Sequence, residues 1–251
     1  MRRLAIRPGG IGDVILSLPA LQHLCCEYLE IWTPARSAPL IQFAHRVRAI
    51  SSTGLDLVGV GDPPQELIRE LASFDSIVSW YGANREDLRK AVAGLPFQFL
   101  QALPGKDCDC HATDFFLQQV GALPGATPRI EVDTNREPFA VIHPFSGSPH
   151  KNWPLEQFRA VAAKLPMPLR WCAGEEDPPL ADAVRIPDLL DLAQFLAGAS
   201  LYIGNDSGIT HLAAAVGTPT LAIFVASDPR IWAPRGEHVR VAQSLRGTEL
   251  P

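Results

Sequence analysis

The fold of this chain is decided by the stretch Leu201-Tyr202-Ile203-Gly204-Asn205-Asp206-Ser207-Gly208-Ile209-Thr210-His211. It begins with an apolar run that is typical of a buried strand, and a polar, glycine-containing turn comes next. A helix follows directly, predicted over residues 209–216 and ended by Gly217. A strand, a short turn and a helix in this order form the building unit of α/β folds with parallel sheets.

The turn in this unit has two possible uses. The first N–H groups of a helix have no partner within it and carry the positive end of its dipole, so they suit a phosphate, and Gly208 allows close approach. Asp206 and Ser207 are equally suited to cap the helix. His211, in the first turn, is by itself more typical of a structural hydrogen-bonding residue than of a catalyst. The residues alone leave anion binding and capping open.

The second half of the chain repeats this theme on both sides of the turn. The predicted elements are strands at residues 139–143, 169–173 and 220–225 and helices beginning at Pro154 and covering 191–199. The loop at residues 143–154 contains one central cation, Lys151, which is suited to neutralise charge on a departing phosphate. A lone loop lysine is more often a solvated surface residue. Glu175 and Glu176 follow another predicted strand. They could accept hydrogen bonds from ribose hydroxyls, or they could simply be exposed surface acids.

The first half opens on a strand at residues 4–7, a glycine turn at 8–12 and a helix expected near Asp13. The glycines form an incomplete dinucleotide fingerprint, because Val14 and Ile15 stand where a third glycine is needed, which disfavours a nicotinamide-dependent dehydrogenase. A carboxylate at a helix start suits a general base and equally suits a cap. Taken alone, Asp13 is better explained as a cap.

The rest of the first half also alternates between strand and helix signals. Short apolar runs at residues 57–60 and 76–80 flank a helical pattern at 65–72. A polar, proline-containing segment near residues 127–138 then separates the halves. We therefore predict an α/β protein with two Rossmann-like domains, residues 1–133 and 134–251, each with a mostly parallel sheet.

Composition narrows the classes of function. The 251 residues include 22 Lys and Arg against 27 Asp and Glu, a net charge of -5, which gives a nucleic-acid partner no support. No apolar segment reaches the ~18–20 residues that span a bilayer, so the expected location is the cytoplasm. The five cysteines fit reduced thiols. Cys108-Asp109-Cys110-His111 lacks the second ligand pair of a structural zinc site, and no metal is expected.

Taken together and in order, the three loops resemble glycosyltransferase family 9, the heptosyltransferases of lipopolysaccharide assembly. The matching segments are residues 7–13 followed by Leu-Pro-Ala-Leu at 18–21, residues 143–154, residues 204–214 and, more weakly, residues 232–236. The resemblance covers most of the second half and, in the first half, chiefly the opening helix. It implies a GT-B fold, in which two Rossmann-like domains with parallel sheets face a central cleft and the N-terminal, acceptor-side domain is shortened.

The resemblance also implies the chemistry. It implies an inverting glycosyltransferase that needs no metal or cofactor. The donor would be ADP-heptose, a nucleotide-diphosphate sugar, and heptose would be moved to a lipopolysaccharide or another glycan or glycolipid acceptor. The protein would make peripheral contact with the inner-membrane surface. Asp13 matches the catalytic base and Lys151 the residue that faces the donor diphosphate. The implied donor-binding residues are Gly12, Ser146, Gly147, Ser148, Glu175, Asp206, Ser207, Gly208 and His211.

Two alternatives remain beside this hypothesis. A nucleotide-sugar-binding protein of the same fold would keep the donor half without transferring the sugar. A GT-B-shaped epimerase would use the same diphosphate site but would need acids and bases around one bound sugar. The presence of both Asp13 and Lys151 favours the transferase.

Overall fold

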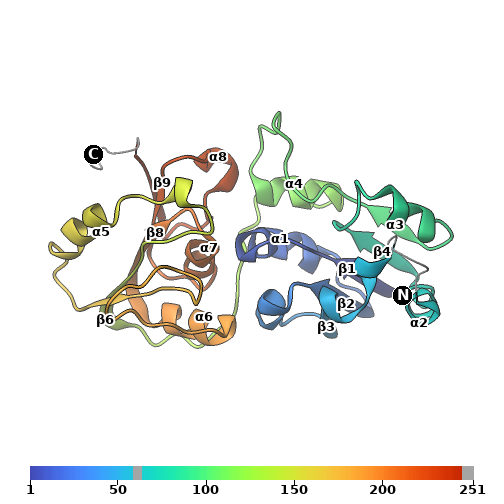
Figure 1. The fold of residues 1–251 in the computed structure, drawn as a ribbon, viewed down its shortest axis with the longest axis horizontal. Coiled ribbons are helices and arrows are strands. Elements are labelled where there is room, and N and C mark those ends of the chain that lie inside the picture. Colours follow the sequence, from blue (N-terminus) through green and yellow to red (C-terminus); the bar gives the residue numbers. More distant parts are fainter. Residues whose placement is uncertain (59–63, 245–251) are drawn as a thin grey trace. The chain divides into compact units, whose positions relative to one another are not determined.

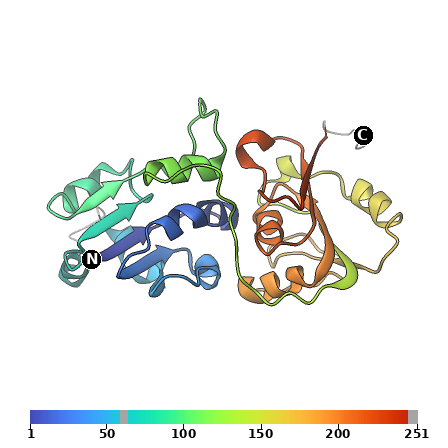
Figure 2. The ribbon, with the colours of Figure 1, turned by 180° about the vertical axis from the view of Figure 1, so that it is seen from behind.

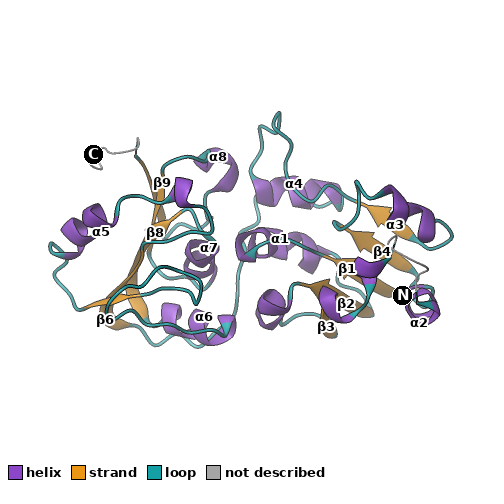
Figure 3. Ribbon diagram, in the orientation of Figure 1, coloured by secondary structure: helices purple, strands orange, loops and turns teal. Residues whose placement is uncertain are grey.

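The computed structural model describes residues 1–58 and 64–244. The chain divides into two compact units: residues 1–108 with 112–126 form the first, and residues 109–111 with 127–251 form the second. Each unit is a parallel α/β sheet with its own helices, coloured along the sequence in Figure 1 and by element type in Figure 3. Figure 2 shows the extended segment that leaves α4 and leads to β6.

The first unit is built on a five-stranded sheet in the order β3-β2-β1-β4-β5, with every neighbouring pair parallel. Its elements are β1 (Arg2–Ile6), α1 (Ile11–His23), β2 (Tyr28–Thr33), η1 (Ala35–Leu40), β3 (Arg46–Ala49), η2 (Ile50–Ser52), η3 (Leu55–Leu57), α2 (Gln65–Leu71), β4 (Ser76–Ser79), α3 (Glu86–Ala91), β5 (Phe97–Phe99) and α4 (Ala112–Gln119). The strand order reverses between β1 and β4. In such sheets, ligands bind beyond the carboxyl ends of the strands at this reversal, which is where the turn before α1 lies.

The first helix shows why its sequence folds this way. The apolar residues Val14, Leu18 and Leu21 recur at helical spacing and are all buried. Helix α4 packs beside α1 in both ribbon views. The helix begins at Ile11, two residues before the predicted start.

The second unit has a five-stranded parallel sheet in the order β10-β9-β8-β6-β7. Its elements are β6 (Glu137–His143), η4 (Pro149–Lys151), α5 (Leu155–Ala162), β7 (Leu169–Trp171), α6 (Leu189–Ala197), β8 (Ala199–Asn205), α7 (Gly208–Ala215), β9 (Thr220–Phe224), α8 (Pro229–Trp232) and β10 (Val239–Gln243). The order reverses between β6 and β8. His143 pairs with Gly204 in register, so the loops that follow these two strands start side by side.

The α/β class and the two parallel sheets are confirmed. The strands β3, β5 and β10 were absent from the sequence prediction, because they are short edge strands in which polar residues interrupt the apolar ones. In the run at residues 57–60, Leu57 belongs to the 3₁₀ turn η3, while residues 59 and 60 lie outside the described residues. Every helix in the described ranges is too short or too polar to cross a bilayer.

Gly204, near the end of β8, is required by the close approach of a buried ring. An added Cβ would lie 2.5 Å from Tyr202 Oη and 2.9 Å from two ring carbons. We expect Gly204→Ala to lower the free energy of unfolding by about 1–3 kcal/mol, since a fully buried ring must shift. Urea denaturation checks this. The control is Gly147→Ala, whose Cβ would meet no atom within 4 Å; equal losses in both variants would refute the steric explanation.

Candidate active site

Asp13 is the third residue of α1, and its carboxylate closes the turn before the helix. Asp13 Oδ2 accepts a hydrogen bond of 2.8 Å from the Gly10 N–H, so Gly10 is the N-cap residue and Asp13 supports the cap from inside the helix. Gly9 has φ +115°, and a Cβ on it would lie 2.8 Å from Asp13 Oδ2, so only glycine leaves space for the carboxylate. Within the described residues, Asp13 Oδ1 accepts no hydrogen bond, which leaves it available to a substrate hydroxyl. Gly12 lies beside Asp13 in the same turn.

Lys151 and Asp206 meet in the second unit, although they come from different loops. Lys151 Nζ donates to Asp206 Oδ2 at 2.7 Å, and the Ser227 hydroxyl donates to the same oxygen. Asp206 is 5% exposed and the Lys151 side chain 38%. The other two N–H donors of Lys151 have no partner in the described part of the chain. The ammonium is therefore held in place with donors free to bind an anion.

Asn205 is the residue that joins these two loops. It is fully buried at the end of β8, where its side-chain oxygen accepts the Trp153 N–H at 2.9 Å and its amide donates to the Pro144 carbonyl at 2.7 Å. The sequence analysis assigned Asn205 no role. A buried amide at a strand end, next to a predicted ligand-binding turn, is the signal that could have found it.

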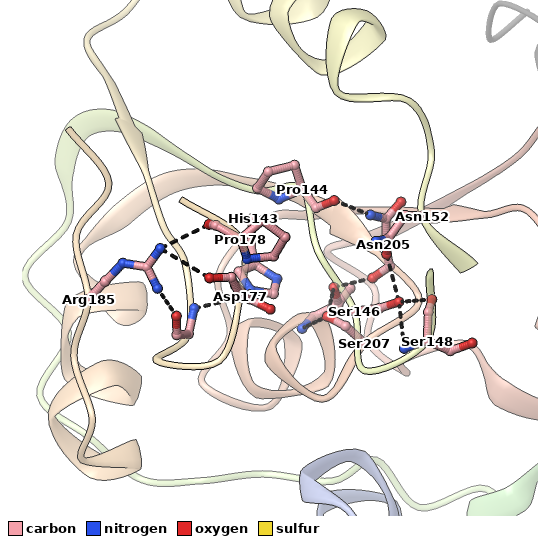
Figure 4. A network of polar contacts seen from close by, with 12 residues as sticks. His143, Pro144, Ser146, Ser148, Asn152, Asp177, Pro178, Arg185, Asn205 and Ser207 are labelled. Carbon is pink, nitrogen blue, oxygen red and sulfur yellow. Dashed lines mark hydrogen bonds and ion pairs between the residues drawn. The ribbon is translucent and has the colours of Figure 1, made fainter. Parts of the chain in front are cut away.

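The loop after β6 is ordered by its own hydroxyl groups (Figure 4). Ser146 Oγ lies 2.8 Å from both the Ser148 carbonyl oxygen and Asn152 Oδ1. Ser148 N–H in turn donates to Ser146 Oγ at 3.4 Å. Gly147, between them, is exposed. Ser146 thus shapes the loop that presents Lys151, whereas direct contact of Ser146, Gly147 and Ser148 with a donor stays a prediction.

The turn before α7 contains the helix cap. Ser207 is the N-cap residue, and its Oγ accepts the Thr210 N–H at 3.3 Å. Throughout the described residues, the N–H groups of Gly208 and Ile209 have no acceptor. Capping by Ser207 therefore leaves the first N–H groups of the helix available, so an anion is compatible with the cap.

His211 is buried close to the Lys151–Asp206 pair. Burial lowers the pKa of His211 to about 4, against the opposing effect of the Asp206 carboxylate. His211 Nε2 lies 4.0 Å from Asp206 Oδ1. At neutral pH this contact is therefore one between an uncharged imidazole and a carboxylate, and Lys151 is the charged partner of Asp206.

The lowered pKa of His211 predicts how stability depends on pH. A folded-state pKa of about 4, below the ordinary 6.5, means that the stabilisation is complete above pH 6.5 and is lost as the pH falls towards 4. Between pH 7 and pH 5 the loss is about 2 kcal/mol. In urea denaturation we expect His211→Gln to lack this part of the pH dependence. His23→Gln, at the exposed end of α1, should keep it; an unchanged pH dependence in His211→Gln would contradict the assignment.

Glu175 and its neighbours form the loop after β7. Glu175 is exposed and lines a hollow of about 650 Å³ together with Asp177 and Arg185. Asp177, which the sequence analysis missed, makes the structural contacts: its Oδ2 lies 3.0 Å from His143 Nε2 and accepts the Gly174 N–H at 2.6 Å. These bonds, the one from His143 first, hold the pKa of Asp177 below its usual value. Figure 4 shows this pair and the Arg185 side chain that reaches the same loop.

The cysteine and histidine cluster before α4 was weighed as a metal site. His111 Nε2 lies 2.8 Å from the Ala233 carbonyl oxygen. Across residues 1–58 and 64–244, no three His, Cys, Asp or Glu side chains come together as a group that could hold a metal ion.

One family model matches part of the second unit. Residues 187–249 match the model of glycosyltransferase family 9 (heptosyltransferase). No curated protein is similar enough in sequence to count as a match.

Solved structures share the fold over almost the whole chain. E. coli heptosyltransferase WaaC with ADP has a TM-score of 0.69 at 17% identity, over 97% of this chain and 93% of the other. E. coli ADP-heptose lps heptosyltransferase II has a TM-score of 0.72 at 16% identity, over 96% of this chain and 90% of the other. The iron-containing dodecameric glycosyltransferase TibC of enterotoxigenic E. coli H10407 has a TM-score of 0.64 at 16% identity, over 95% of this chain and 61% of the other. At these identities the likeness shows the fold, which is of the GT-B type.

Proposed function

From its relation to glycosyltransferase family 9, in sequence over residues 187–249 and in fold over both units, we propose that this protein is a glycosyltransferase that moves a sugar from a nucleotide-diphosphate donor to a glycan or glycolipid acceptor. The observation that carries the proposal is the meeting of Lys151 and Asp206 beside the uncapped N–H groups of α7. The Lys151–Asp206 contact lies at the point where the strand order of the second sheet reverses, which is where α/β proteins bind ligands. The donor class is ADP-heptose, the ligand class named for the related structures.

The proposed reaction is a direct displacement that inverts the anomeric carbon. The acceptor hydroxyl gives its proton to Asp13 Oδ1 while its oxygen forms the new bond to the anomeric carbon. The bond from that carbon to the diphosphate breaks, and the leaving group takes the electron pair. Lys151 and the N-terminus of α7 stabilise the charge that develops on the diphosphate. The step requires Asp13 of the first unit to meet the donor held by the second.

Donor binding is the most direct test of this proposal. Calorimetric titration of the full chain with ADP-, GDP- and UDP-linked sugars should show saturable binding of the ADP-linked sugar, and then release of ADP when a lipopolysaccharide-core acceptor is added. If none of the three donors binds, the transferase proposal fails. Donor binding without transfer to any acceptor would instead support the nucleotide-sugar-binding alternative.

We also propose that transfer needs no metal ion, because the Lys151 ammonium and the helix N-terminus can supply the positive charge that a cation would bring. Treating the protein with a chelator and removing it by dialysis should then leave kcat within about twofold of its starting value. ADP release before and after treatment measures this. Loss of activity that Fe²⁺ or Mg²⁺ restores would contradict metal independence without affecting the assignment of the donor.

A further inference from the structure

Arg7 is a buried cation directly after β1. It is 1% exposed, and in the described part of the chain no carboxylate lies within ion-pair distance of its guanidinium. Burial lowers its pKa to about 10, against the opposing effect of the Asp13 carboxylate, so the side chain is still charged near neutral pH. A buried charge without a direct ion pair is costly to keep in a fold, which calls for a specific reason for an arginine at this position.

The hydrogen bonds of Arg7 converge on the first turn of α1. Its Nε donates to Ser17 Oγ at 2.9 Å, and one terminal N–H donates to the Asp13 carbonyl oxygen at 2.9 Å. Asp13 and Ser17 are one helical turn apart, so the guanidinium connects both ends of the turn. The other terminal nitrogen donates to the Ala102 carbonyl oxygen at 3.1 Å, and the Phe116 ring of α4 lies 4.4 Å from the guanidinium carbon.

This turn has little stiffness of its own. It follows Gly9 and Gly10 and contains Gly12, and glycine restricts the backbone less than any other residue. Beyond the local bond from the Gly10 N–H to Asp13 Oδ2, tertiary hydrogen bonds are needed to make the turn rigid. A planar guanidinium with N–H groups in fixed directions can bind three acceptors at once, whereas a lysine ammonium cannot match that arrangement.

We infer that Arg7 is a positioning residue, which holds the first turn of α1 and thereby the Asp13 carboxylate in the orientation that proton abstraction needs. The inference rests on the proposed role of Asp13 as the base. Arg7 does not touch the substrate in this scheme. It acts only through Asp13.

A double-mutant cycle separates this role from a general effect on stability. We expect Arg7→Met to lower kcat for sugar transfer about 30–100-fold while the Kd of the donor, measured by calorimetry, stays the same. In an Asp13→Asn background the same substitution should cost less than about threefold, because the residue through which it acts is already disabled. Equal losses in both backgrounds would overturn the inference.

Two further variants sharpen the cycle. Arg7→Lys keeps the charge but loses the planar guanidinium with its N–H groups in fixed directions, and we expect about a tenfold lower kcat. A wild-type rate would overturn the inference. Arg3→Met is the matched control, since Arg3 lies on β1, the strand that leads to Arg7, and donates at 2.9 Å to the Leu24 carbonyl oxygen beyond the other end of α1. Its kcat should stay within about twofold.

Amide hydrogen exchange tests the same inference without any assay of transfer. In Arg7→Met, amides of residues 13–17 should exchange at least about tenfold faster, while those of residues 20–23 keep their protection. If Arg7→Met does not fold, Ser17→Ala removes one acceptor and should give the same pattern to a smaller extent. Unchanged exchange of the first turn would overturn the inference. If the wild-type protein transfers no sugar, the proposed function fails, whereas the exchange result still decides whether Arg7 holds the turn.

Discussion

Replacing Asp13 by asparagine should lower kcat for sugar transfer by about 10²–10⁴-fold, the contribution typical of a general base. Asparagine keeps the shape of the side chain and an oxygen that can accept the Gly10 N–H, so the cap of α1 is retained. What it loses is the ability of the free oxygen to take a proton from the acceptor hydroxyl. The donor should bind with unchanged affinity, because Asp13 is not among the residues proposed to hold it.

The experiment measures ADP release together with calorimetric donor binding. Asp191→Asn serves as a matched control, because Asp191, which is exposed, is also a carboxylate in the first turn of a helix, α6. Its kcat should equal that of the wild type. An Asp13→Asn protein that turns over at the wild-type rate would show that the base is another group.

The second large effect is expected from Lys151→Met. The methionine has nearly the same length and no charge, so the developing charge on the leaving diphosphate loses its cation, which lowers kcat about 10²–10³-fold. Donor affinity should fall as well, because Asp206, 5% exposed, then lacks its ion-pair partner and its negative charge repels the diphosphate.

Lys151→Arg distinguishes charge from a structural role. It keeps the positive charge, and we expect it to recover most of the donor affinity and part of kcat. The unfolding free energy of each variant, from urea denaturation, shows whether the change is confined to the site. If Lys151→Met retained the wild-type kcat at saturating donor, the role of Lys151 in stabilising the leaving group would be wrong.

The arrangement of the second unit explains how one site draws on several loops. In a parallel sheet all carboxyl ends lie at one edge, and at the reversal between β6 and β8 the chain leaves that edge in opposite directions. The Asn205 side chain fills the space between the two departing loops and fixes both. Helix α7 can therefore present its N-terminus next to Lys151 without a long connecting segment.

Much of the fold could be predicted from sequence, because its determinants are local. The strands at β1, β4, β6, β8 and β9 are apolar runs followed by turn residues, and the helices α1, α2, α5, α6 and α7 carry apolar positions at helical spacing. The edge strands β3, β5 and β10 escaped prediction. Their short, partly exposed sequences acquire strand structure from the neighbouring strand they pair with, which is a tertiary effect.

The sequence by itself determined that two α/β units follow one another. It also determined that a carboxylate in one unit and a capped helix start in the other each follow a strand and its turn, since turn and cap residues act over a few positions. Only the tertiary structure decided which side chains meet. The Lys151–Asp206 and His143–Asp177 contacts join residues 55 and 34 positions apart, so they depend on strand order and register. Strand order and register also bring the Arg7 guanidinium into contact with the turn that contains Asp13. For the same reason, His143 contacts Asp177 and not the predicted Glu175 two positions before it.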